Sequence, residues 1–231
     1  MYYENLHPPF EVETGVRPQA AIILLHGLDS SGRAFGPIIK HLDLQDFCAV
    51  RFILPNAPIQ PVLWAGGQRL PAWYDLRSNN FVEQEDEEGL RAGQRYYESL
   101  IRREIDRGIS PHRIVIGGFS QGGALSLMTG IRFAERLGGI FAMSGYLPLA
   151  ATTEREQSRA NRRTPIFLAH GEQDNIIFPG LVVAGRNLLK KQGHEVSFYT
   201  YSMGHSICAA ELDDLKKWLK QILSMGLIKT S

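Results

Sequence analysis

The segment Gly118-Phe119-Ser120-Gln121-Gly122 constrains the fold of this chain more than any other. It follows the apolar run Arg113–Gly117 and precedes Ala124–Met128, which has a helical pattern. A strand, a sharp turn centred on a serine and a helix are the context that a nucleophile elbow requires. The glycines two positions before and after Ser120 lack the Cβ that would collide with neighbouring backbone.

Glycine fills 23 of the 231 positions, so the motif alone also fits a glycine-rich turn with an incidental serine. The apolar β-branched run before the motif and the helical pattern after it favour the nucleophile. This interpretation requires that the rest of the chain supply a base, an orienting acid and donors for an oxyanion.

Short apolar runs alternate along the chain with longer amphipathic patterns. The predicted strands are Ala20–His26, Ala49–Leu54, Arg113–Phe119, Gly139–Met143, Pro165–His170 and Val196–Tyr201, with Phe10–Thr14 as an additional edge strand. The predicted helices are Arg33–Leu42, Glu87–Arg107, Gln121–Glu135, Gly180–Gln192 and Ser206–Leu223. Strands that are continuous apolar runs are buried on both faces. We therefore expect an α/β fold with a mostly parallel central sheet and helices on both faces.

No composition shift or linker divides the chain, and we expect residues 1–231 to form one domain. The segment 55–75 departs from the alternation, because four prolines and the pair Gly66-Gly67 exclude a long helix. This proline-rich excursion lies between a strand end and the next helix, where it can cover a site. Its apolar residues fit either an acyl pocket or a small satellite core.

The charge balance gives no reason to expect a nucleic acid or an anionic membrane as a partner, since the formal net charge is +1. No apolar stretch approaches the length that spans a bilayer, so no stable membrane insertion is expected. Cys48 and Cys208 show no metal-ligand spacing and suit reduced, packed thiols. The first residues lack the pattern of a signal peptide, and we expect a cytoplasmic protein.

The base must follow Ser120 and leave the carboxyl end of a strand, where catalytic groups gather in such a fold. His205 meets this requirement, because it follows the last predicted strand in the turn after Ser202-Met203-Gly204. His170 ends a strand and is interpreted as part of the strand cap. His194 precedes the last strand, at the wrong edge of the sheet, and is expected to be exposed to solvent.

The acid is expected on the loop that follows the strand Ile166–Ala169. Asp174 is the preferred residue, because a short aspartate on a tight loop holds an imidazole with less freedom than the competing Glu172. Asp213 and Asp214 lie in the final helix pattern and fit a polar face better.

An oxyanion hole needs backbone donors aimed at the oxygen on which charge develops. One donor is expected from the amide of Gln121, directly after the nucleophile, and the other from Leu28 in the loop after the first long strand. His26, at the start of that loop, is interpreted as a brace rather than a catalytic group.

Taken together, these motifs resemble the carboxylesterase and acyl-protein thioesterase family of α/β-hydrolases, from about Ala20 to Leu223. The motifs are Leu25-His26-Gly27-Leu28, Leu54-Pro55-Asn56-Ala57-Pro58, Pro71-Ala72-Trp73-Tyr74-Asp75, Gly118–Leu127, Ser144-Gly145-Tyr146-Leu147-Pro148 and Met203-Gly204-His205-Ser206. The resemblance implies hydrolysis of carboxylic esters or thioesters without metal or cofactor. It also implies a Ser120, Asp174 and His205 triad, with Leu28 and Gln121 as oxyanion donors.

By the same resemblance, the residues that border the acyl pocket are Leu63, Trp73 and Ile176-Ile177-Phe178. Two departures from the family pattern are relevant. Asp29-Ser30 stands where the family usually has glycine and aspartate, a change that bears on the conformation of the first loop. Phe178 replaces a usual proline, and a bulky residue there is expected to narrow the pocket and favour short acyl chains.

The main functional hypothesis is a serine carboxylesterase that acts on short-to-medium acyl esters through an acyl-enzyme intermediate. The alternative is an acyl-protein thioesterase or a lysophospholipase with the same triad, and the substrate is then an acyl thioester or a lipid ester. A third hypothesis, a non-catalytic receptor on a hydrolase scaffold, is disfavoured because all three triad members are present. The sequence leaves the oligomeric state open, a homodimer included.

Overall fold

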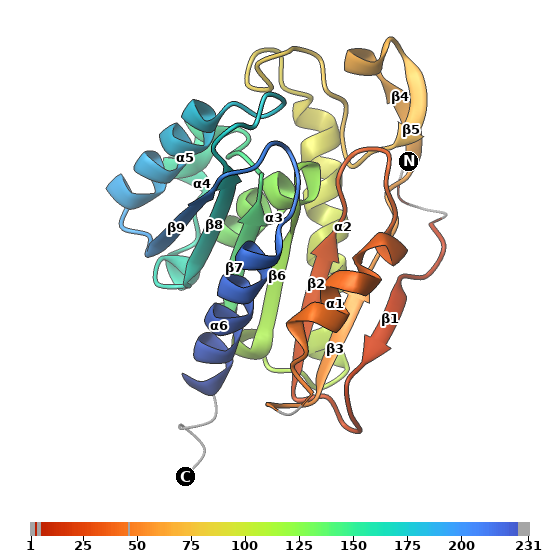
Figure 1. The fold of residues 1–231 in the computed structure, drawn as a ribbon, viewed down its shortest axis with the longest axis vertical. Coiled ribbons are helices and arrows are strands. Elements are labelled where there is room, and N and C mark those ends of the chain that lie inside the picture. The colour runs from red at the N-terminus through yellow and green to blue at the C-terminus, as the bar shows by residue number, and fades with distance from the viewer. Residues whose placement is uncertain (1–2, 4–5, 46, 226–231) are drawn as a thin grey trace.

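The computed structural model describes residues 3, 6–45 and 47–225, and its centre is a sheet covered by helices on both faces (Figure 1). Within these residues, seven strands form the sheet in the order β1-β3-β2-β6-β7-β8-β9. Their bounds are β1 Phe10–Glu13, β2 Ala20–Leu25, β3 Val50–Leu54, β6 Ile114–Phe119, β7 Gly139–Met143, β8 Ile166–Gly171 and β9 Val196–Tyr201. Strand β1 pairs antiparallel with β3, and all other neighbours pair in parallel. The predicted α/β fold is confirmed.

The helices divide into two layers, one on each face of the sheet (Figure 1). Their bounds are α1 Gly36–Leu42, α2 Glu87–Asp106, α3 Gln121–Arg132, α4 Thr153–Glu156, α5 Pro179–Lys191 and α6 Ala209–Met225. Strand β2 is buried along its whole length, and alternate side chains enter different cores. Ile22 and Leu24 pack in the core under α1 and α6, whereas Ile23 and Leu25 pack in the core under α2, α3 and α5. None of the described helices is long and apolar enough to cross a membrane.

The predicted elements agree with the structure except at some ends. The first helix is preceded by a 3₁₀ turn at Gly32–Phe35, and α3 ends at Arg132 rather than Glu135. Helix α6 begins at Ala209 rather than at Ser206, and the amide of Ser206 donates in a turn to the carbonyl of Gly204 at 2.9 Å.

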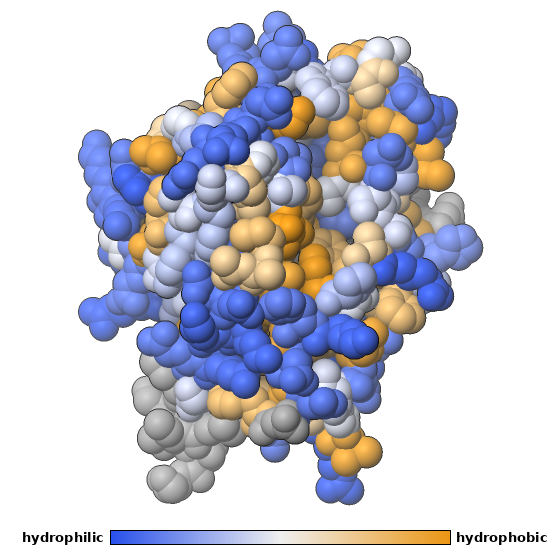
Figure 2. All heavy atoms as spheres, in the orientation of Figure 1, coloured by the Kyte–Doolittle hydropathy of each residue, from blue (hydrophilic) through white to orange (hydrophobic). Residues whose placement is uncertain are grey.

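The proline-rich excursion contains an antiparallel hairpin that was not predicted, formed by β4 (Ile59–Val62) and β5 (Gln68–Pro71). Gly66 and Gly67 have positive φ angles of 68° and 81°, a conformation that glycine adopts without strain. The hairpin exposes Leu63, and apolar residues gather over it at the upper right of Figure 2. The segment is therefore an ordered projection beside the sheet, with an apolar outer surface.

The strands β2, β6, β8 and β9 run parallel, so the loops that follow them all start at the same end of the sheet, the upper end in Figure 1. Catalytic groups in open α/β sheets lie outside the carboxyl ends of the strands. The four loops that carry the predicted site residues are thereby brought together at the carboxyl ends of the strands.

Candidate active site

Ser120 occupies the sharp turn between β6 and α3 with φ 56° and ψ −120°, a conformation that is strained for a residue with a side chain. Its amide donates to the carbonyl of Met143 at 2.9 Å, which fixes the turn to the neighbouring strand. A Cβ on Gly118 or on Gly122 would overlap the carbonyl of Leu25. The sequence motif is therefore a steric requirement of this turn.

The three side chains predicted as a triad lie in one hydrogen-bonded chain. The distance from Ser120 Oγ to His205 Nε2 is 2.9 Å, and His205 Nδ1 lies 2.7 Å from Asp174 Oδ2. Asp174 is buried, and its second oxygen, Oδ1, accepts the amides of Ile176 and Ile177 at 2.9 Å each. With its carboxylate held in place, the imidazole is oriented to accept a proton from the serine hydroxyl.

The loops that carry the acid and the imidazole pack directly against each other. The amide of Glu172 donates to the carbonyl of Tyr201 at 2.9 Å, and the amide of Gln173 donates to Met203 at 3.0 Å. A Cβ on Gly171 would overlap the carbonyls of Met203 and Gly204. The Glu172 carboxylate accepts a hydrogen bond from Thr200 at 2.9 Å, whereas the bond to His205 is made by Asp174.

Two other histidines lie in surroundings that their positions in the sequence did not reveal. His170 is buried, with Nε2 2.8 Å from the carbonyl of Ile177 and 3.5 Å from Asp174 Oδ2, and its burial lowers its pKa. The expectation that His194 is exposed is wrong, since only 4% of it is accessible and Nε2 lies 3.0 Å from Gln157 Oε1. The chain reverses at Gly193, which has φ 88°, and turns His194 inward.

His26 braces the first loop, in agreement with its predicted role. Its Nε2 accepts the amide of Ala57 at 3.0 Å, so Nδ1 carries the hydrogen donated to the carbonyl of Gly27 at 2.6 Å. Burial lowers the pKa of His26 to about 4, despite the opposing hydrogen bond to that carbonyl. The ring is therefore neutral at physiological pH and ties the first loop to the proline-rich excursion.

Leu28 and Gln121, whose backbone amides were predicted as oxyanion donors, line the cavity beside Ser120. Within the described residues, neither amide donates to another protein group, so both are free to bind a substrate oxygen. Gln121 is the first residue of α3, where the helix dipole favours negative charge. Its side chain accepts the amide of Trp73 at 3.1 Å and donates to the carbonyl of Tyr74 at 2.8 Å, which links the excursion to the elbow.

A cavity of about 450 Å³ opens beside Ser120 and His205. Of the predicted pocket residues, Ile176 and Ile177 line it, but Leu63, Trp73 and Phe178 do not. Leu63 and Phe178 are exposed on the outer surface, so Phe178 does not narrow the cavity. Trp73 is fully buried behind the wall, where its indole nitrogen donates to the carbonyl of His26 at 2.7 Å.

Most of the cavity wall is apolar and comes from segments that are far apart in the sequence. Trp64, Leu70 and Tyr74 also line the cavity, and they lie in the segment 55–75, whose apolar residues were expected to form either an acyl pocket or a satellite core. Wall residues that sequence reasoning missed are Ala34, Phe35, Ile38, Leu76, Phe81, Phe119, Tyr146 and Ile207. No local pattern distinguishes these side chains from ordinary core residues. The wall suits an acyl chain, which is apolar and carries no charge.

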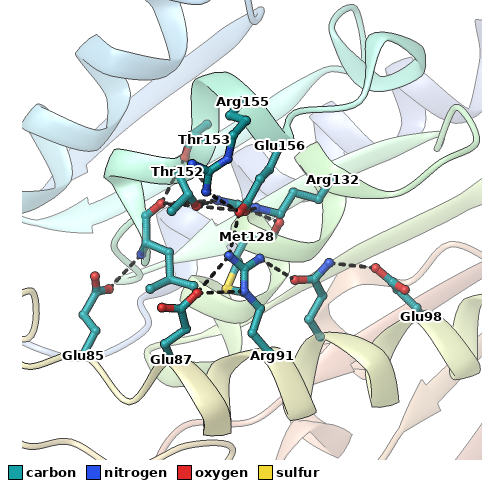
Figure 3. Close-up of polar contacts among 12 residues, drawn as sticks. Glu85, Glu87, Arg91, Glu98, Met128, Arg132, Thr152, Thr153, Arg155 and Glu156 are labelled. Atoms are coloured by element: carbon teal, nitrogen blue, oxygen red, sulfur yellow. Dashed lines mark hydrogen bonds and ion pairs between the residues drawn. The ribbon is translucent and has the colours of Figure 1, made fainter.

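A partly buried polar network connects helices α2 and α3 to the segment between β7 and α4 (Figure 3). Arg132, at the end of α3, donates to Glu156 at 2.9 Å, and Arg91 of α2 donates to the same carboxylate at 2.8 Å. Partial burial raises the pKa of Glu156, but hydrogen bonds from these arginines and a threonine outweigh it and lower the pKa to about 2. Glu85 accepts the amide of Leu149 at 2.8 Å. The network thus joins two helices to a segment that contributes to the cavity wall.

Known proteins resemble this chain both in sequence and in fold. The model of the phospholipase/carboxylesterase family matches residues 8–223. This chain belongs to that family. The acyl-protein thioesterase 1 of Neurospora crassa is 39% identical over 225 residues, which cover 94% of this chain and 92% of that protein. The acyl-protein thioesterase 1 of Saccharomyces cerevisiae is 35% identical over 211 residues, or 88% of this chain and 92% of that protein.

Solved structures agree with the sequence comparison. The crystal structure of Arabidopsis thaliana SOBER1 superimposes with a TM-score of 0.83 at 30% identity, covering 88% of this chain and 99% of that one. The crystal structure of Zea mays acyl-protein thioesterase 2 has a TM-score of 0.78 at 28% identity, covering 93% and 99%. The protein is an α/β-hydrolase, and the named relatives favour the thioesterase alternative over a general carboxylesterase.

Proposed function

We propose that this protein is an acyl-protein thioesterase, which hydrolyses the thioester between a fatty acyl group and a protein cysteine. The chemistry rests on the hydrogen-bonded chain from Ser120 through His205 to Asp174. The substrate class rests on the relatives from two fungi named acyl-protein thioesterase 1, which are 35% and 39% identical over nearly the whole chain.

In the proposed reaction, Ser120 Oγ attacks the thioester carbonyl and its proton passes to His205 Nε2. The carbonyl oxygen becomes an oxyanion, which the amides of Leu28 and Gln121 stabilise. The C–S bond then breaks, and the departing thiolate takes the proton from His205. Water attacks the acyl-enzyme by the same route and releases the fatty acid. Asp174 stays ionised throughout and stabilises the imidazolium.

The test of this chemistry is Ser120→Ala, assayed on an octanoyl thioester of a short cysteine peptide and on the matched octanoyl oxyester. We expect kcat to fall by roughly 10⁶-fold, as in other triad knockouts, and labelling by a fluorophosphonate probe to disappear. Ser99→Ala is the matched control, because Ser99 is exposed on α2 and donates only to the carbonyl of Tyr96. If the probe still labels Ser120→Ala, Ser120 is not the nucleophile.

The substrate class is tested separately with the wild-type protein. Thioesters, oxyesters and lysophospholipids that carry the same acyl chain are compared by kcat/KM. We expect the thioester to be the preferred substrate. An oxyester preferred over its thioester would instead support the carboxylesterase hypothesis, and a preferred lysophospholipid would support a lysophospholipase. The cytoplasmic location and the homodimer stay predictions from the sequence.

A further inference from the structure

Asp29 directly follows the proposed oxyanion donor Leu28, in the loop after β2, and lines the cavity. It adopts the left-handed conformation with φ 55°, which aspartate tolerates better than most residues other than glycine. Its amide donates to the carbonyl of Pro71 at 2.9 Å, so the loop is held against the hairpin. The aspartate therefore preserves a conformation for which glycine is the usual residue.

The side chain of Asp29 is exposed and, within the described residues, makes no hydrogen bond or ion pair. Among the described residues that line the cavity, it is the only aspartate, glutamate, lysine or arginine. The other lining residues are apolar or neutral, apart from two histidines. Asp29 thus places a carboxylate at the opening of a cavity whose other described lining residues include no aspartate, glutamate, lysine or arginine.

The size of the cavity indicates which part of a substrate meets this charge. A volume of about 450 Å³ can enclose an acyl chain but not the polypeptide that carries the acylated cysteine. The polypeptide must therefore lie along the rim, on the solvent side, while the acyl chain contacts the apolar wall. Asp29 is exposed at this rim and is placed to meet the residues that flank the cysteine.

We propose that Asp29 determines leaving-group specificity and favours S-acylated cysteines flanked by lysine or arginine. The proposal rests on the thioesterase function proposed above. It also predicts that lysophospholipids are disfavoured, because their phosphate lies between the acyl-bearing glycerol and the headgroup and would place a negative charge near Asp29. The same carboxylate therefore attracts basic peptides and repels anionic leaving groups.

The expected size of the effect follows from Coulomb's law. One unit charge about 6 Å from the carboxylate in water changes kcat/KM by about threefold, so a basic and an acidic peptide should differ by roughly tenfold. The preference should nearly vanish at 1 M NaCl, where the Debye length is about 3 Å.

The experiment uses three peptides with the same octanoyl group on a central cysteine, flanked by lysine, glutamine or glutamate. A fourth substrate is an octanoyl lysophosphatidylcholine. Each is assayed with the wild-type protein and with Asp29→Asn, since asparagine keeps the shape of the side chain and tolerates the left-handed conformation. Asp43→Asn is the matched control, because Asp43 also has a positive φ of 41° but does not line the cavity.

We expect kcat/KM in the wild type and in Asp43→Asn to decrease from the lysine peptide to the glutamine peptide and then to the glutamate peptide. In Asp29→Asn the three values should converge within about twofold, and the lysophospholipid should gain relative to the glutamine peptide. A lysine-to-glutamate ratio unchanged by Asp29→Asn, or equal rates on all three peptides in the wild type, overturns the role of Asp29. Failure to hydrolyse even the glutamine peptide would instead overturn the proposed thioesterase function on which this inference rests.

Discussion

The substitution Asp174→Asn tests the triad most sharply, because the structure determines how the new side chain must sit. Two backbone amides, those of Ile176 and Ile177, donate to Asp174 Oδ1 at 2.9 Å each. An amide nitrogen cannot accept hydrogen bonds, so the asparagine oxygen must stay at the Oδ1 position. The NH₂ group then replaces Oδ2, which lies 2.7 Å from His205 Nδ1.

A donor at this position reverses the tautomer of His205. Nδ1 must then accept the hydrogen bond, and Nε2 carries the hydrogen, facing Ser120 Oγ 2.9 Å away. A protonated Nε2 cannot take the serine proton. A wrong tautomer of this kind lowers kcat by about 10⁴-fold in a serine protease, which corresponds to about 5 kcal/mol in activation free energy.

The assay is kcat for an octanoyl thioester at neutral pH, with circular dichroism and thermal unfolding to show that the variant is folded. Glu172→Gln is the control, since its carboxylate bonds to Thr200 and not to His205. We expect this control to retain nearly full activity. The reasoning is refuted if folded Asp174→Asn keeps more than about a tenth of the wild-type kcat, or if Glu172→Gln is the more damaging change.

Two further predictions concern stability. Tyr97→Phe removes a buried hydroxyl that bonds to the carbonyl of Ile23 at 2.9 Å and accepts the amide of Gly117 at 3.0 Å, so we expect a loss of about 1–3 kcal/mol in unfolding free energy. Urea unfolding measures this loss. The control is Tyr96→Phe, which should leave the unfolding free energy nearly unchanged because the Tyr96 hydroxyl makes no hydrogen bond within the described residues. Equal losses of unfolding free energy in the two variants would contradict the prediction. Burial raises the pKa of Glu211 to about 8, which favours its protonated form in the folded state, so its contribution to stability is lost as pH rises from about 4.5 to 8. Glu211→Gln should therefore raise the melting temperature at pH 8.5 more than at pH 5, and an equal shift at both pH values would show that Glu211 does not titrate in this range.

The convergence of Ser120, His205 and Asp174 could be predicted from the sequence because these residues are tied to local backbone features and to the sheet topology. Ser120 requires glycine on both sides of its turn, and His205 follows a glycine at the end of the last strand. Parallel strands then bring these loops to one edge without further information. The position of Asp174 followed from the same topology, although the two amides that fix its carboxylate did not.

The cavity could not be predicted in the same way, because its wall depends on how distant segments pack. Trp73 and Phe178 were both expected at the pocket from the resemblance to the family, but neither lines the cavity: Trp73 is fully buried and Phe178 is exposed. Tyr146 and Phe81 were not predicted as pocket residues, although both line the cavity and their rings are 5.9 Å apart. Only tertiary contacts determine which side of an aromatic residue faces a cavity.

Gln121 shows how a residue found by its motif can have a second role that the motif does not encode. Its amide was predicted as an oxyanion donor from its place after Ser120. Its buried side chain also bonds to the backbone of Trp73 and Tyr74, and the ring of Tyr74 lines the cavity. The same residue therefore ties a wall of the cavity to the backbone amide that we propose as an oxyanion donor. Because both bonds involve backbone groups of the excursion, a displacement of that segment would strain the first turn of α3, which carries the proposed oxyanion donor.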